Sequence, residues 1–347
     1  MTAQQDSTKS ASASRPLLAA RGLTVSFPVK TGILRRTVAS LTAVDGVDLD
    51  IIEGETLGLI GESGSGKSTL GRALLRLVEP TGGQVILDGT DVCALAPHAL
   101  KPVRRQAQLI FQDAAGSLNP LMTVRQIIGA GLRAHGARDQ AERDARVAEV
   151  LKAVGLDADA GRRYPHEFSG GQRQRIGIAR ALVLRPRLII ADEPVSALDV
   201  SIQAQVLKLL VELKQEFRLT YLFIGHDLAV VDCISDRVAV MYLGKIVEVG
   251  SAAEVRDRPQ HPYTRALLSA HRPPALGQRG QRVVLAGEPP NPMAPPSGCR
   301  FRTRCPLAQD ICAEQEPLLE PRGTGHMAAC HFSHLVGGPA EPLRVSL

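Results

Sequence analysis

The sequence contains no tryptophan, and only 3% of its 347 residues are aromatic. Proteins that bind single-stranded nucleic acid usually stack bases on aromatic side chains, so this scarcity argues against that function. No run of about 18 uncharged apolar residues occurs, which excludes a membrane-spanning helix. Residues 1–16 are rich in Ser, Ala, Gln and Thr and lack an apolar stretch, so we expect a disordered tail rather than a secretion signal.

The six cysteines include no CxxC pair, and in a cytosolic chain they are more often free or metal-bound than joined in disulfides. The net charge of +6 points weakly to an anionic partner or a membrane surface. A hydrophobic content of 44% is ordinary for a globular protein. The length allows one large domain or two smaller ones.

A glycine-rich segment follows the apolar run 56–60 and precedes a helical pattern that begins at Leu70. Strand, glycine-rich loop and helix in this order are typical of a phosphate-binding loop, whose backbone N–H groups surround a nucleoside triphosphate. We expect Lys67 to reach the β- and γ-phosphates and the Ser68 hydroxyl to bind Mg²⁺. The expected ATP-binding residues of this segment are Gly61, Glu62, Ser63, Gly64, Ser65, Gly66, Lys67, Ser68 and Thr69.

The apolar run 188–191 ends in two acids, Asp192 and Glu193. A continuous apolar run predicts a parallel strand covered on both faces, and ligands bind beyond the carboxyl ends of such strands. Asp192 is expected to hold Mg²⁺ directly or through water, and Glu193 to act as the general base on the attacking water. The alternative is that one of these acids caps the following helix.

Two further strands are expected to deliver polar side chains to the same edge. The run 108–111 ends before Gln112, and the run 222–225, taken as the last core strand, ends before His226. His226 is placed to hydrogen-bond a γ-phosphate, although a lone histidine at a strand end is otherwise structural. Residues from about 113 to 185 have helical character, and a helix opens after Ser169, either as an anion site or as an ordinary N-cap.

Two short strands, 20–27 and 43–49, flank a basic, turn-rich insert and predict an antiparallel layer. Phe27 either stacks on an adenine base or fills the core of this small sheet.

In this order, the motifs closely resemble the ATP-binding cassette of ABC transporters. They are the loop 61–69, LIFQD at 109–113, which contains Gln112, FSGGQ at 168–172, LIIADEP at 188–194, SALD at 196–199, and His226. The signature begins with Phe168 where the family usually has leucine. The resemblance implies an α/β P-loop NTPase core with an N-terminal antiparallel β layer, a helical insertion and a short irregular extension that contains cysteines. It places the ATPase domain at 17–260, with a helical subdomain at about 113–185, and the extension at 261–347.

In that family two cassettes dimerise head to tail, and each ATP lies between the P-loop of one and the signature of the other. The resemblance therefore assigns Gln112 to Mg²⁺, to the attacking water and to the link with a permease. Because Glu193 and His226 are intact, it implies a hydrolysing subunit rather than a regulatory cassette. It assigns further ATP contacts to Phe27, Ser169, Gly170, Gly171, Gln172 and Asp199.

A narrower resemblance, to the oligopeptide/dipeptide importer branch, is carried by 27–30, 43–47, 111–113 with 117–120, and 261–268. It implies a second, different ATPase subunit, two permeases, an extracytoplasmic binding protein and a peripheral place on the cytoplasmic face of the inner membrane. Peptide is the leading substrate; nickel, glutathione or another solute is the alternative. A soluble cassette ATPase that acts on nucleic acid is less favoured, and no nucleic-acid partner is expected.

The Pro- and Gly-rich tail beyond about residue 270 holds Cys299, Cys305, Cys312 and Cys330. Four soft ligands in a segment too small to fold alone suit a metal, either zinc or an iron–sulfur cluster, and the absence of any metal is a third alternative. The resemblance to the importer branch favours [4Fe–4S]. The remaining two, Cys93 and Cys233, lie in or beside apolar stretches, so we expect them to be inert packing residues.

Overall fold

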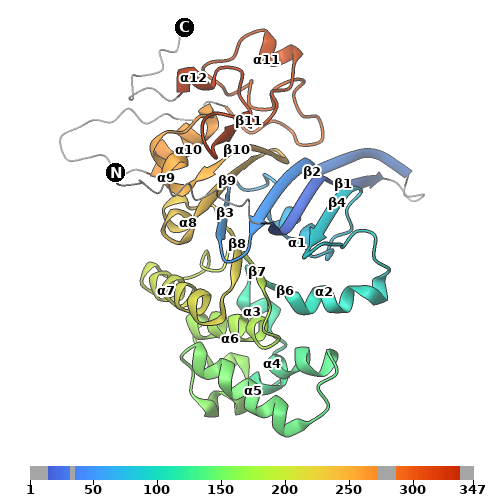
Figure 1. Cartoon of the computed structure of the whole chain (residues 1–347), viewed down its shortest axis with the longest axis vertical. Coiled ribbons are helices and arrows are strands. Elements are labelled where there is room, and N and C mark those ends of the chain that lie inside the picture. Colours follow the sequence, from blue (N-terminus) through green and yellow to red (C-terminus); the bar gives the residue numbers. More distant parts are fainter. Residues whose placement is uncertain (1–14, 32–35, 272–286, 337–347) are drawn as a thin grey trace, which may run out of the picture.

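The computed structural model describes residues 15–31, 36–271 and 287–336, which form two β-sheets, the helices around them and a C-terminal extension (Figure 1). Most of the predicted N-terminal tail lies outside these residues, and Pro16 already belongs to a strand. The smaller sheet is antiparallel, as predicted, in the order β2–β1–β4–β5. Its strands are β1 (Pro16–Thr31), β2 (Arg36–Ile52), β4 (Gly82–Leu87) and β5 (Thr90–Asp91).

The two long strands of this sheet extend well beyond the predicted 20–27 and 43–49. Part of the basic segment that looked like a turn continues the ladder, and Thr31 pairs with Arg36. Charged and β-branched side chains are tolerated in such a ribbon because pairing needs only one buried face. In the predicted part of the two strands, that face is formed by Leu23, Val25 and Val47, which are all buried.

The larger sheet has eight strands in the order β11–β12–β10–β9–β3–β8–β7–β6. Its parallel strands are β3 (Thr56–Ile60), β6 (Ala107–Ile110), β7 (Leu188–Asp192), β8 (Thr220–Ile224) and β9 (Arg237–Tyr242). Every residue of β3, β7 and β8 is buried, as their continuous apolar runs predict. The prediction that 222–225 is the last core strand is wrong, because β9 pairs with β3 on the other side and β10 (Lys245–Ser251) follows it.

The stretch predicted to be helical contains α3 (Ala114–Ser117), α4 (Val124–Ala134), α5 (Gln140–Ala153) and α6 (Gly170–Leu182). In Figure 1 α4 and α5 lie at the end of the molecule opposite α11 (Ile311–Glu314) and α12 (Ser333–Val336). The sheets are flanked by α1 (Lys67–Leu74), α2 (Lys101–Gln106), α7 (Val200–Phe217), α8 (Leu228–Ile234), α9 (Ala252–Asp257) and α10 (Pro262–His271). No helix within the described ranges is both long and apolar enough to cross a membrane.

The C-terminal extension is built into the large sheet. It contributes α11 (Ile311–Glu314), β11 (Glu320–Pro321), β12 (Met327–Ala328) and α12 (Ser333–Val336). Strand β12 pairs antiparallel with β10, so that Glu248 lies opposite Ala328. The sequence did not predict this junction because strands of two residues carry no periodic signal.

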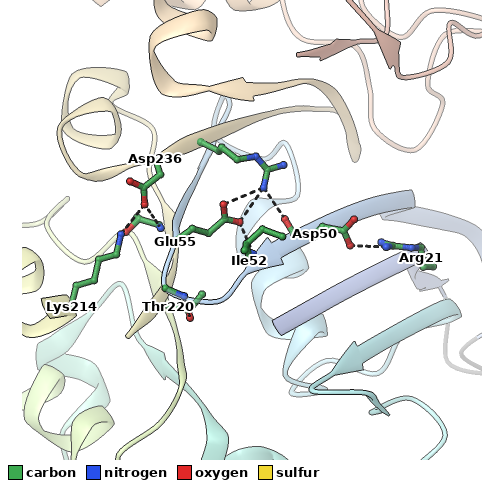
Figure 2. A network of polar contacts seen from close by, with 10 residues as sticks. Arg21, Asp50, Ile52, Glu55, Lys214, Thr220 and Asp236 are labelled. Carbon is green, nitrogen blue, oxygen red and sulfur yellow. Dashed lines mark hydrogen bonds and ion pairs between the residues drawn. The ribbon is translucent and has the colours of Figure 1, made fainter. Parts of the chain in front are cut away.

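Polar contacts join the small sheet, the large sheet and α7 (Figure 2). Asp236 accepts hydrogen bonds from the backbone N–H of Thr56 and from Nζ of Lys214, both at 2.7 Å. Burial raises the pKa of Asp236, but the hydrogen bonds from Lys214 and Thr56 and the charge of Lys214 together outweigh it, so the pKa lies below its usual value. Nearby, Oε1 of Glu55 lies 3.0 Å from Nη1 of Arg237. These contacts fix the start of β3, which leads directly into the glycine-rich loop.

Candidate active site

The glycine-rich loop connects β3 to α1 and is closely packed against β2. At Gly66 the backbone has φ = 106°, and a methyl group there would lie 2.1 Å from the carbonyl oxygen of Ala43. Only glycine fits such a position without strain. Gly66 is also the N-cap of α1 and offers no side chain to the first N–H groups of the helix. These groups therefore face the loop and can bind an anion.

Lys67 lies beneath this loop with 4% of its surface exposed. Its ammonium group donates hydrogen bonds to the carbonyl oxygens of Gly61 and Glu62, both at 2.8 Å. Burial lowers the pKa of Lys67, whereas the charges of Glu193, Asp192 and Glu62 act in the opposite direction. The structure thus positions a compensated, buried cation at the floor of the loop, which is where a phosphate-binding lysine is needed.

Asp192, at the end of β7, is almost fully buried and binds the first turn of α1. The Ser68 hydroxyl donates to its Oδ1 at 2.7 Å, and Nη2 of Arg72 lies 3.4 Å from its Oδ2. Sequence reasoning missed Arg72, although its spacing of four residues from Ser68 places both on one helix face. Ser68 and Asp192 supply the hard oxygen donors that Mg²⁺ prefers, and Mg²⁺ needs few protein ligands beside phosphate oxygens. The residues present therefore fit Mg²⁺.

Glu193 meets two side chains from neighbouring strands. Its Oε2 accepts a hydrogen bond from Nε2 of Gln112 at 2.9 Å and lies 3.3 Å from Nδ1 of His226. Its backbone has φ = 47°, a left-handed conformation that non-glycine residues adopt at a cost of roughly 1–3 kcal/mol. We call Gln112, Glu193 and His226 the strand-end cluster, because they follow β6, β7 and β8. Such a carboxylate, held by an amide and an imidazole, can accept a proton from water.

Neither Asp192 nor Glu193 caps the following helix: the N-cap of α7 is Asp199. That alternative from the sequence is therefore wrong.

The signature residues form a second group at the start of α6 and α7. Ser169 is the N-cap of α6, and its backbone N–H donates to Oε1 of Gln172 at 3.0 Å. A methyl group at Gly171 would lie 2.6 Å from the side chain of Ile202 on α7, so close packing requires glycine there. Ser169 therefore caps α6 in the ordinary way and is also exposed to solvent. We call Ser169, Gly170, Gly171, Gln172 and Asp199 the signature group; its contact with ATP stays a prediction.

Phe27 lies on β1 opposite Leu41, two residues along β2 from the Ala43 that borders the loop. Its surface is 39% exposed, so it does not fill the core of the small sheet. The position suits a ring that stacks on a base, which stays a prediction.

The four cysteines of the extension line one small cavity together with Phe301 and Phe332. Burial raises the pKa of Cys305 to about 12 and that of Cys330 to about 11. Among the described residues, however, no three or more His, Cys, Asp or Glu side chains form a group that could hold a metal ion. The iron–sulfur cluster and its zinc alternative therefore stay predictions.

The expectation that Cys233 is a packing residue is wrong. It is exposed, because α8 buries Leu228, Val231 and Ile234 on its other face, whereas Cys93 is partly buried as expected.

Comparison with known proteins found family models and relatives that match most of the chain. A family model described as ABC transporter matches residues 44–196, and one described as oligopeptide/dipeptide transporter, C-terminal region, matches residues 247–312. The chain is 54% identical over 311 residues to the oligopeptide transport ATP-binding protein AppF of Bacillus subtilis (strain 168), covering 88% of this chain and 94% of AppF. It is 53% identical over 315 residues to a putative peptide import ATP-binding protein of Brucella ovis, covering 91% and 97% of the two chains.

Two solved structures extend the comparison to the fold. A dimeric ATP-binding cassette in a post-hydrolysis state bound to ADP and Pi has a TM-score of 0.60 and 31% identity, and the match covers 68% of this chain and 98% of that one. The protein cbiO1 from Clostridium perfringens, part of an ABC transporter complex, has a TM-score of 0.59 and 28% identity, with 69% and 90% covered.

Proposed function

The chain belongs to the ABC transporter family, and we propose that it is the ATP-hydrolysing subunit of an importer for di- and oligopeptides. One observation carries the proposal: Oε2 of Glu193 lies 2.9 Å from Nε2 of Gln112 and 3.3 Å from Nδ1 of His226. The hydrogen bond from Ser68 to the neighbouring Asp192 lies beside this cluster. A strand-end carboxylate next to a phosphate-binding loop is the arrangement that phosphoryl transfer to water requires.

In the proposed mechanism the loop N–H groups and Lys67 bind the triphosphate and orient its γ-phosphate. Ser68 and Asp192 would hold Mg²⁺, which neutralises charge on the phosphate oxygens. Glu193 accepts the proton of the attacking water, while Gln112 and His226 hold the carboxylate and the water in line. Positioning and charge neutralisation carry most of the catalysis, because phosphoryl transfer needs little covalent chemistry from the protein.

We propose that the signature group completes the ATP site of a second, different cassette subunit. The dimeric cassette bound to ADP and Pi, which is 31% identical, supports pairing of this fold. The exposed position of Ser169, Gly170 and Asp199 leaves the group accessible to such a partner. A site shared between subunits is completed only on closure, which links ATP occupancy to movement of the partners.

The names of the similar proteins support peptide as the substrate, and the C-terminal match to the oligopeptide/dipeptide transporter region supports the branch. On this proposal the chain binds two permease subunits on the cytoplasmic face of the inner membrane, and an extracytoplasmic binding protein delivers the peptide. Substrate choice then lies in those other subunits, so nickel, glutathione or another solute is the alternative cargo.

Uptake of a labelled dipeptide by cells that carry either wild-type protein or Glu193→Gln tests the proposal. Loss of uptake in the variant, at equal protein level, is expected. The matched control is Glu212→Gln, because Glu212 is an exposed glutamate on α7 paired with Lys208 at 3.8 Å. Unchanged uptake in the Glu193 variant contradicts peptide import driven by this site.

We also propose that Cys299, Cys305, Cys312 and Cys330 hold a [4Fe–4S] cluster. The support is that all four thiols line one cavity, and four cysteine thiolates are the donor set that a [4Fe–4S] cluster takes. Iron and acid-labile sulfide in protein purified without oxygen are expected. Colourless, iron-free protein contradicts this proposal and leaves the ATPase assignment intact.

A further inference from the structure

The C-terminal extension contacts the phosphate-binding loop through a paired arginine and glutamate. Arg304 donates from Nη1 to Oε2 of Glu62 at 2.8 Å and from Nη2 to Oε1 at 3.1 Å, although the two residues are 242 positions apart. This fork-to-carboxylate geometry is the strongest form of ion pair. The side chain of Arg304 is 5% exposed and that of Glu62 26%, so solvent screens the pair only weakly.

A second contact reaches the same loop residue. The backbone N–H of Glu62 donates to the Tyr263 hydroxyl at 2.7 Å. The Tyr263 ring packs against Tyr242 and Phe301, with centroid distances of 4.6 Å and 5.5 Å, and all three rings are buried. Since Phe301 lies three residues before Arg304, this aromatic cluster fixes the chain segment that presents the guanidinium.

Stability alone does not explain a buried arginine at this place. Burying an ion pair usually gains little over apolar residues of the same volume, because both charges lose their hydration. In addition, Nε of Arg304 has no hydrogen-bond partner among the described residues. The arrangement is explained by the loop itself, where the Glu62 carbonyl accepts a bond from Lys67 at 2.8 Å and an unpaired Glu62 carboxylate would repel a polyanionic nucleotide.

We propose that Arg304 is a positioning residue for nucleotide binding: it neutralises Glu62 and holds the loop so that Lys67 and the loop N–H groups meet the triphosphate. The extension thereby completes the nucleotide site of its own chain. This inference rests on the proposed ATP binding and goes beyond it, because it makes ATP affinity depend on a segment outside the cassette motifs.

Equilibrium binding of a fluorescent ATP analogue with Mg²⁺ to the full-length protein tests the inference. For Arg304→Met we expect the Kd to rise about tenfold, since one unpaired charge near the phosphates costs on the order of 1.4 kcal/mol. The loss should shrink as salt is added, because salt screens the repulsion. Adding Glu62→Gln to Arg304→Met should restore most of the affinity, because the unpaired charge is gone. The Arg304→Lys variant keeps the positive charge, so its affinity for the analogue should fall less than that of Arg304→Met.

The matched control is Arg302→Met, because Arg302 lies in the same segment and its hydrogen bonds go to Ser297. It should bind the analogue as wild type does. If the methionine variant does not fold, Arg304→Gln gives the same comparison with a neutral side chain that still donates hydrogen bonds.

Wild-type affinity in Arg304→Met overturns the inference. Weak binding of the analogue by the double variant Arg304→Met with Glu62→Gln also overturns it. If Arg304 had only a structural role, removing the charge of Glu62 would not restore the affinity. Failure of the wild-type protein to bind the analogue contradicts the proposed ATP binding itself, and the two failures are thus distinguishable.

Discussion

Replacing Glu193 with glutamine is expected to stop ATP hydrolysis while leaving ATP binding intact. The amide has the shape of the carboxylate, and its oxygen can still accept the 2.9 Å hydrogen bond from Gln112. The cluster should therefore keep its geometry and lose only the ability to take a proton from water. A positioned general base contributes about 10²–10⁴-fold to the rate, equivalent to ~3–5 kcal/mol of transition-state stabilisation. We expect the kcat to fall by that factor.

Phosphate release by the full-length chain purified together with its partner cassette subunit gives the rate, and binding of a fluorescent ATP analogue gives the affinity. Asp192→Asn is the informative comparison, because Asp192 accepts the Ser68 hydrogen bond and would hold Mg²⁺. That variant should lose Mg²⁺-dependent binding as well as turnover. A Glu193→Gln protein that binds and hydrolyses ATP at nearly the wild-type rate would refute the reasoning, since another group would then have to be the base.

Two further predictions concern stability. The pKa of Asp236 is lowered in the folded protein despite burial, because Lys214 donates to it, so its contribution is present at neutral pH and lost as the pH falls below about 4. Asp236→Asn should lower the urea midpoint at pH 7 and flatten its fall between pH 5 and pH 3. His326→Ala should lower the free energy of unfolding by about 1–3 kcal/mol in urea denaturation, because it removes the hydrogen-bond partner 2.8 Å from the fully buried Glu248, which keeps only the backbone N–H groups of Gln260 and His261. The control is His334→Ala, because His334 is exposed on the same segment, and an equal loss there would contradict a specific contribution from the contact between His326 and Glu248.

The nucleotide site could be predicted from the sequence because its parts are set by local rules. The loop requires glycine at fixed positions, and Lys67 and Ser68 follow it in the first turn of the helix. The meeting of Gln112, Glu193 and His226 follows from topology: side chains just beyond the carboxyl ends of adjacent parallel strands share one edge. Periodicity and apolar runs therefore sufficed for this half of the site.

The other half depends on contacts that carry no local signal. Nothing in the spacing of the tail indicates that Arg304 reaches Glu62, because the two residues are 242 positions apart and meet only in the folded chain. The strand β9 was missed for a related reason: its apolar run follows a short helix, and single-sequence periodicity does not tell which neighbour a buried strand will take. Such long-range pairings are decided by packing.

The arrangement around the loop separates two properties of the nucleotide site. On one side the turn after β9 and the extension hold the loop: the Gly244 N–H donates to the Ser65 carbonyl at 2.8 Å, and Arg304 binds Glu62. On the other side, the strand-end cluster is fixed by β6, β7 and β8, which the extension does not join. Changes in the extension should therefore alter the Kd for ATP and leave the kcat of hydrolysis nearly unchanged. Changes at Glu193 should lower the kcat and leave the Kd for ATP nearly unchanged. A chain built in this way can tune how readily it takes ATP without disturbing the chemistry of hydrolysis.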